Sequence, residues 1–90
     1  KDAFKGCTRI NNVVIPNNIR ILMDGCFGNC TSLTKVYIET YEPDDIIVSY
    51  TGSMTEGVNE TFKIYIHNES FTKFATNYYW GTYSSYFVGY

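Results

Sequence analysis

Ala3-Phe4-Lys5-Gly6-Cys7-Thr8-Arg9-Ile10 and Cys26-Phe27-Gly28-Asn29-Cys30-Thr31-Ser32-Leu33 are two versions of one motif, separated by 23 residues. The segment Val13-Val14-Ile15 is answered by Val36-Tyr37-Ile38 at the same separation. A period of this length is typical of solenoids, in which one repeat forms one coil that cannot bury its apolar face alone. The repeat therefore predicts stacked coils, with an extended surface and no pre-formed catalytic pocket.

The composition is that of one small domain rich in strands and turns. The 90 residues include nine tyrosines, and 44% of them are apolar. A net charge of −2 with no basic cluster predicts no nucleic-acid binding, and no apolar run is long enough to insert into a membrane. The chain starts at Lys1, inside a repeat, so we expect it to be a piece of a longer protein whose export signal lies upstream.

Alternating residues predict one half-buried strand in each coil, over 12–16, 35–39 and 63–67. The third strand follows the second by 28 residues, so we expect about five inserted residues in the loop near 51–61. Shorter extended segments near 19–21 and 46–48 are expected on the other side of the coil. The side chains predicted to face the core are Val13, Ile15, Val36, Ile38, Ile64 and Ile66.

The C-terminal region has a different pattern, which predicts a cap over the last coil. One apolar stripe indicates a helix over about 71–79, with Ser70 as its N-cap and Gly81 as its stop. The aromatic tail is expected to fold back over the same end. We therefore divide this single domain into repeat coils over 1–66 and a cap over 67–90. The stripe consists of Phe71, Phe74, Ala75, Tyr78 and Tyr79, and the tail residues are Trp80, Tyr83, Tyr86 and Phe87.

Several of these residues match a known family. Phe4–Thr8 and Phe27–Leu33 resemble the "AF-x-GC-T-S-L" signature of BspA-like leucine-rich repeats, and Val13–Ile21 resembles the run that follows it. The ending, with Ile64–His67 and Trp80, is similar to the terminal cap of such proteins. The resemblance implies a right-handed leucine-rich-repeat β-solenoid of about two and a half coils, with parallel strands and a C-terminal capping helix. It also implies a surface or secreted protein of host-associated bacteria that acts by adhesion.

No residue pattern indicates catalysis, and we predict no enzyme activity, cofactor or metal site. His67 is the single histidine and has no partner for a nucleophile–base pair. Glu42 and Asp44-Asp45 could form an acidic or calcium site, but a solvated turn is favoured because the spacing does not match a calcium loop. Among the three cysteines, Cys7 and Cys30 hold equivalent repeat positions and are expected to pack as buried thiols, whereas the Cys26–Cys30 pair lacks enough further ligands for zinc.

Strand alternation defines the candidate binding surface. If the Val and Ile side chains point inward, their neighbours point outward and form three rows across the sheet. Tyrosine next to charged side chains suits recognition, since it offers contact area and a hydroxyl group. The alternative interpretation is that cross-strand pairs of this kind only stabilise the sheet. The candidate ligand-binding residues are Tyr37, Tyr65, Val14, Lys35, Lys63, Asn12, Glu39 and His67.

We therefore expect a non-catalytic binding module of a cell-surface or secreted protein, which adheres to a host extracellular protein or glycan through the sheet face. The alternative is a structural role, in which these coils cap or space a longer solenoid and have no ligand. The first coil, around Phe4, Ile10 and Val13, has no covering neighbour in this chain. Its apolar end is expected to favour end-to-end self-association.

Overall fold

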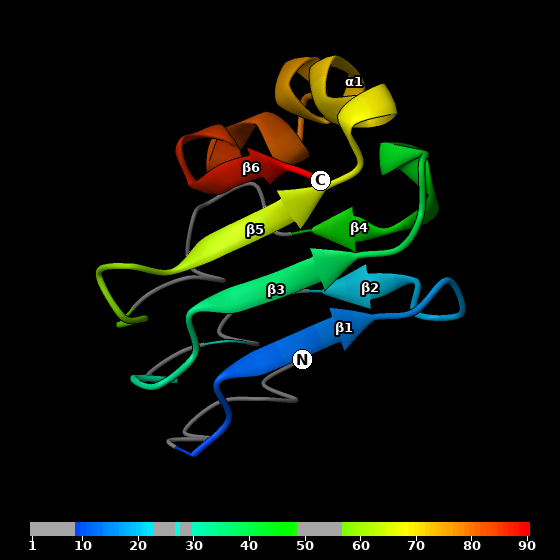
Figure 1. Cartoon of the computed structure of the whole chain (residues 1–90). Helices are drawn as coiled ribbons and strands as arrows, with labels where there is room; N and C mark the ends of the chain where they lie inside the picture. The colour runs from blue at the N-terminus through cyan, green and yellow to red at the C-terminus, as the bar shows by residue number, and fades with distance from the viewer. Residues whose placement is uncertain (1–8, 23–26, 28–29, 49–56) are drawn as a thin grey trace.

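The computed structural model describes residues 9–22, 27, 30–48 and 57–90. Within them, two sheets of parallel strands face each other across a common core. Short helices lie across one end (Figure 1). The larger sheet has the order β1-β3-β5-β6, and the smaller sheet pairs β2 with β4. The strands are β1 (Asn12–Ile15), β2 (Ile21–Leu22), β3 (Lys35–Ile38), β4 (Ile47–Val48), β5 (Lys63–Ile66) and β6 (Phe87–Gly89).

The strand register confirms the repeat period and the separation of 28 residues that follows it. Asn12 lies beside Lys35, and Lys35 lies beside Lys63, with all pairs parallel. Backbone hydrogen bonds between consecutive coils hold this register. The amide of Thr34 donates to the carbonyl of Asn11, and the amide of Lys63 donates to that of Thr34, both at 2.9 Å.

The inward side chains form the core, as alternation predicts. Ile15, Val36, Ile38, Ile64 and Ile66 are each at most 1% exposed, and Leu22 and Val48 join them from the smaller sheet. Full burial of one such side chain contributes about 1.5–3 kcal/mol, so this column accounts for much of the stability. Val13 is half-buried, because β1 lies at the edge of the sheet. The parallel strands of the predicted solenoid are thus present.

The inserted residues are not confined to the loop near 51–61. β4 follows β2 by 26 residues, since Ile21 pairs with Ile47. Three of the five extra residues therefore precede β4, in the turn that contains the 3₁₀-helix η1 (Pro43–Asp45), and the other two follow it. The predicted position was therefore wrong for three of the five inserted residues. A change in strand spacing gives the size of an insertion but not its position. Residues 51–56 of the predicted loop lie outside the described part of the chain.

The C-terminal helix is shorter than its stripe of apolar residues predicts. The 3₁₀-helix η3 (Asn68–Ser70) leads into α1 (Phe71–Thr76), and the second 3₁₀-helix η4 (Trp80–Tyr86) follows. Ser70 holds the N-cap position without a side-chain capping bond. The helix ends because Asn77 is extended and its side-chain oxygen accepts hydrogen bonds from the amides of Tyr79 and Trp80. Tyr78 is therefore 76% exposed rather than part of the apolar stripe.

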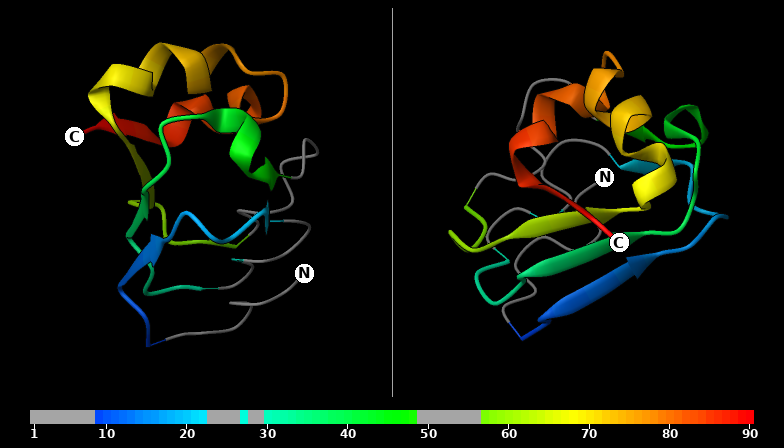
Figure 2. Two further views of the ribbon diagram at one scale, coloured as in Figure 1. Left: turned by 90° about the vertical axis from the view of Figure 1, so that its right-hand side faces the viewer. Right: turned by 45° about the horizontal axis from the view of Figure 1, so that its top comes forward.

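The aromatic tail covers the end of the stack and then adds a strand. Trp80, Tyr83 and Phe87 are buried, and Tyr86 packs edge-on against Phe62. Figure 2 shows α1 and η4 across the end of the stack opposite β1. The unpredicted element is β6, in which Phe87 pairs with Ile64, again at a separation of 23 residues. A Cβ atom at position 89 would meet the side-chain oxygen of Asn68, so a larger residue there would require the exposed Asn68 side chain to turn away.

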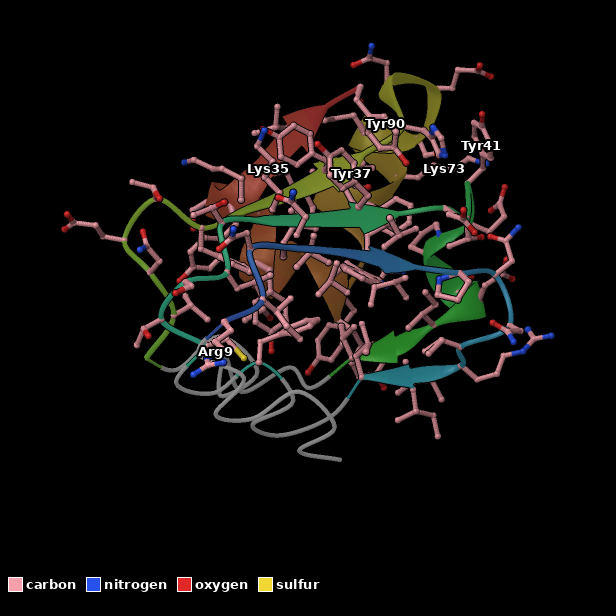
Figure 3. All side chains as sticks on the ribbon, turned by 60° about the horizontal axis from the view of Figure 1, so that its bottom comes forward. Arg9, Lys35, Tyr37, Tyr41, Lys73 and Tyr90 are labelled. Atoms are coloured by element: carbon pink, nitrogen blue, oxygen red, sulfur yellow. The ribbon has the colours of Figure 1, made fainter. Side chains whose placement is uncertain are left out.

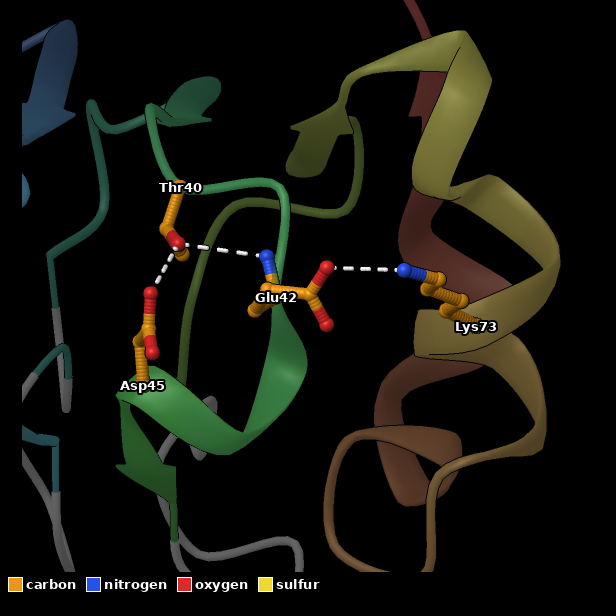
Figure 4. A network of polar contacts seen from close by, with 4 residues as sticks. All are labelled: Thr40, Glu42, Asp45 and Lys73. Carbon is orange, nitrogen blue, oxygen red and sulfur yellow. Dashed lines mark hydrogen bonds and ion pairs between the residues drawn. The ribbon is translucent and has the colours of Figure 1, made fainter.

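Hydrogen bonds and one ion pair fix the cap to the turn between β3 and β4. The indole N–H of Trp80 donates to the carbonyls of Pro43 and Ile46, at 3.0 and 3.1 Å. Within the turn, the Thr40 hydroxyl donates to Asp45 and accepts from the amide of Glu42 (Figure 4). The carboxylates of this turn thus bond to neighbouring side chains. Lys73 of α1 forms an ion pair with Glu42 at 2.7 Å, and Asn77 donates to Asp44.

Cys30 is buried at 1% exposure within the core, in agreement with the predicted packing role of a small apolar residue. Cys7 and Cys26 lie outside the described residues, so the predicted stacking of Cys7 on Cys30 stays a prediction. None of the helices that the structure describes has the length and apolar character to span a bilayer.

Replacing Trp80 with phenylalanine should lower the free energy of unfolding by about 2–4 kcal/mol. The variant leaves two buried carbonyl groups without their indole donor and opens a small cavity. Urea unfolding followed by circular dichroism measures the change. The matched control is Tyr78→Phe, an aromatic change at an exposed position of the same cap, which should stay within about 0.5 kcal/mol of the wild type. A Trp80 variant as stable as this control would contradict the assigned role.

Candidate binding face of the sheet

The outer face of the larger sheet carries two of the predicted rows in register. Asn12, Lys35 and Lys63 form the lysine row, and Val14, Tyr37 and Tyr65 form the central row. Val14 is 54% exposed, the lysine row is exposed, and both tyrosines are half-buried. Strand alternation therefore predicts which side chains share this face, as Figure 3 shows for Lys35 and Tyr37.

The third predicted row continues onto Tyr90, which strand alternation did not predict to lie on this face. Pro16, Glu39 and His67 follow their strands, and Tyr90 extends the series from β6, 23 residues after His67. The Tyr90 amide donates to the carbonyl of Ile66, so the backbone of Tyr90 continues the sheet. Applying the repeat period to His67 would have identified Tyr90, but only if β6 had been recognised.

Five aromatic side chains from four segments meet at the carboxyl end of the strands, and we call them the aromatic cluster. Tyr37 stacks on Tyr65 with ring centroids 4.7 Å apart, and Tyr90 packs edge-on against both rings. On the other side, the His67 ring lies between Tyr41 at 4.0 Å and Tyr90 at 4.6 Å. Each such pair contributes about 0.5–1.5 kcal/mol beyond its buried area. The cluster is composed of Tyr37, Tyr41, Tyr65, His67 and Tyr90.

Hydrogen bonds hold the His67 end of the cluster in place. The Nε2 atom of His67 lies 2.9 Å from the carbonyl oxygen of Glu39, which can only accept, so Nε2 carries the proton in this contact. The Tyr90 hydroxyl donates to the carbonyl of Ile38 at 3.0 Å and thereby crosses β5 to reach β3. These contacts give His67 and Tyr90 a structural role in fixing the cluster.

The hydroxyls of Tyr37 and Tyr65 differ from that of Tyr90. Neither makes a hydrogen bond to any residue that the structure describes, although their rings are fixed by stacking. The two hydroxyls are consequently donors and acceptors that remain available to a ligand. They are the polar atoms at the centre of the outer face.

Lys35 and Lys63 also have no ionic partner in the described part of the chain, where the ion pair present joins Lys73 to Glu42. Glu39 lies at the opposite end of β3 from Lys35. The outer face is therefore positive at the amino ends of its strands and acidic at their carboxyl ends.

The outer face carries charged, hydroxyl and aromatic groups that a ligand could contact. No group of three His, Cys, Asp or Glu side chains in the described ranges is placed to hold a metal ion. The Nε2 atom of His67 contacts the carbonyl of Glu39 and lies 3.4 Å from the Tyr90 hydroxyl, and the His67 ring lies between those of Tyr41 and Tyr90. What the face offers is two ammonium groups, two hydroxyls and a rigid aromatic surface.

A family model for the BspA type leucine rich repeat region (6 copies) matches residues 1–77. The chain belongs to the BspA-type leucine-rich-repeat family. No curated protein matches it closely enough to be counted as a relative. Repeats of the BspA type form protein-interaction modules, are typically non-catalytic and are typically surface-associated.

Burial raises the pKa of Tyr90 above its ordinary value of about 10, and the nearby charge of Glu39 acts in the same direction. The folded chain therefore keeps this proton at a pH where the unfolded chain has released it. The stabilising effect of the Tyr90 hydroxyl is present below about pH 10 and is lost as the pH rises through the raised pKa.

We expect wild-type protein to be more stable than Tyr90→Phe at neutral pH, since the variant loses the hydroxyl bond to Ile38. This difference in the free energy of unfolding should shrink above about pH 10, where Tyr90 ionises. Urea unfolding of both proteins from neutral to alkaline pH measures it. A difference that stays constant or grows with pH would contradict the placement of Tyr90.

Proposed function

We propose that this chain is a non-catalytic binding module of a cell-surface or secreted protein, which adheres to a host protein or glycan through the outer face. The observation that carries the proposal is that two tyrosines with unbonded hydroxyls and two lysines without an ionic partner occupy adjacent rows of the outer face. Membership of the BspA-type family supports an interaction role. The rigid setting also favours binding, because the rings are already ordered and a ligand need not restrict them.

Stacking of Tyr37 on Tyr65 also supports the structural alternative, so the test must leave the rings in place. The double variant Tyr37→Phe with Tyr65→Phe removes both hydroxyls and keeps the stacked rings. It should weaken binding about tenfold to the strongest binder in a panel of immobilised matrix proteins and glycans, measured by biolayer interferometry. The free energy of unfolding should change by no more than about 0.5 kcal/mol.

The control is Tyr78→Phe with Tyr79→Phe, which removes two hydroxyls from exposed, edge-packed rings on the cap. This control should bind like the wild type. Equal binding by both double variants, equal loss in both, or a panel in which nothing binds would each contradict the proposal.

A second role, as a spacer or end of a longer solenoid, is favoured by a different observation. The end of the stack at β6 is covered by α1 and η4, whereas Val13 and Ile10 at the β1 end are half-buried (Figure 2). Their equivalents one coil later, Val36 and Leu33, are each 1% exposed. Another coil of the same repeat would fit against this end. In the isolated chain, the first coil of a second copy could cover it instead.

End-to-end self-association should make the weight-average mass, measured by light scattering, rise with protein concentration. The isosteric change Val13→Thr places a hydroxyl at the apolar end and should shift this rise to higher concentration. A mass that stays monomeric at every concentration would contradict association through this end.

A further inference from the structure

The lysine row contains an uncompensated charge. Lys35 and Lys63 are register partners on neighbouring parallel strands, which lie about 4.8 Å apart. Like charges placed directly opposite each other destabilise a sheet, and no described carboxylate forms an ion pair with either lysine. The chain as a whole is acidic, with a net charge of −2, so this positive site is local. An anionic ligand would relieve the repulsion by lying between the two ammonium groups.

The ligand must be recognised by side chains rather than by backbone. β3 and β5, which carry Lys35 and Lys63, are paired on both sides within the order β1-β3-β5-β6. An extended peptide therefore finds no free strand edge at this site and cannot add main-chain hydrogen bonds there. Hydroxyl and ammonium groups on a fixed surface suit the many oxygen atoms of a saccharide instead.

The tyrosines offer hydroxyls and not ring faces. Tyr37 and Tyr65 are stacked on each other, and Tyr90 packs edge-on against both. Val14 and Val88 are their register partners on the two remaining sides. Because Tyr37 and Tyr65 each have one ring face against the other, the hydroxyls are the groups of these two residues that suit a polar ligand. The two tyrosines that carry the unbonded hydroxyls form the row next to the lysine row.

We propose that the outer face binds an anionic polysaccharide, which deepens and rests on the binding function proposed above. Its sulfate or carboxylate groups lie on Lys35 and Lys63, and its hydroxyl and ring oxygens contact the hydroxyls of Tyr37 and Tyr65. The polysaccharide crosses the strands, since both pairs are aligned across the sheet. Glu39 repels anionic groups from the carboxyl end of the strands and so fixes them at the lysine row.

The test measures binding of the 90-residue chain to immobilised dextran sulfate at low salt, with unsulfated dextran and polyglutamate as comparison surfaces. The wild type should bind dextran sulfate, should bind neither comparison surface comparably, and should lose affinity as salt is added. Lys35→Gln with Lys63→Gln should weaken binding about tenfold or more. Relief of like-charge repulsion should leave the stability of this variant unchanged or slightly raised.

A matched control separates a specific site from general charge attraction. Arg20→Gln with Lys73→Gln removes the same number of positive charges at exposed positions outside the lysine row, and the ion pair that it breaks is exposed and weak. This control should keep most of the affinity. Equal loss in both variants, no binding of dextran sulfate, or equally tight binding of polyglutamate through the same lysines would overturn the proposal.

Failure of the polysaccharide proposal can be distinguished from failure of the proposed binding function. Suppose that Tyr37→Phe with Tyr65→Phe no longer binds a matrix protein, whereas Lys35→Gln with Lys63→Gln binds that protein and dextran sulfate like the wild type. This result would support the outer face as a binding surface and would contradict the anionic polysaccharide as its ligand. If neither variant changes binding to any surface, both proposals are contradicted.

Discussion

Parallel stacking of the inward Val and Ile side chains, coil upon coil, is the constraint on which the rest of the structure depends. Ile15 lies beside Ile38, and Val36 lies beside Ile64, so each coil completes the burial of the one before it. A slip of one residue would exchange the core and the outer face, because side chains alternate along a strand. The register that buries the core therefore also aligns the lysines and tyrosines outside.

Aromatic packing and hydrogen bonds together hold the C-terminal helices against the last coil. Phe74, Trp80 and Phe87 pack against one another under α1 and η4, and Trp80 bonds to two carbonyls of the β3–β4 turn. Because β6 pairs with β5 at the same separation of 23 residues, the cap preserves the repeat geometry. It also carries Tyr90 onto the outer face, where Tyr90 orders the tyrosines of the neighbouring strands.

The strands and the outward rows could be predicted because they follow from two short-range patterns, the repeat and the alternation within it. The doubled motif predicted the pairing of Asn12 with Lys35 and of Val14 with Tyr37. Features set by individual side chains could not be found in this way. The Asn77 side chain ends α1 early by bonding to two later amides. β6 contains Gly89 instead of an inward aliphatic residue, so alternation alone gives no strong strand signal there.

The aromatic cluster shows the same limit at the candidate site. Tyr37, Tyr65 and His67 were predicted to share a face, but their contact with Tyr41 and Tyr90 depends on a turn and on the unpredicted strand. As a result, His67 and Tyr90 hold the rings of the aromatic cluster in position. We propose as ligand-binding groups the ammonium groups of the lysine row and the two tyrosine hydroxyls, which make no bond to another described residue.

Nuclear Overhauser contacts between backbone protons test the in-register parallel stack most directly. The in-register parallel stack predicts contacts that link Val36 with Ile64 and Ile64 with Phe87, in the staggered pattern of parallel strands. Contacts typical of antiparallel pairs, a shift of one residue in the pairing, or no contact between Ile64 and Phe87 would contradict it.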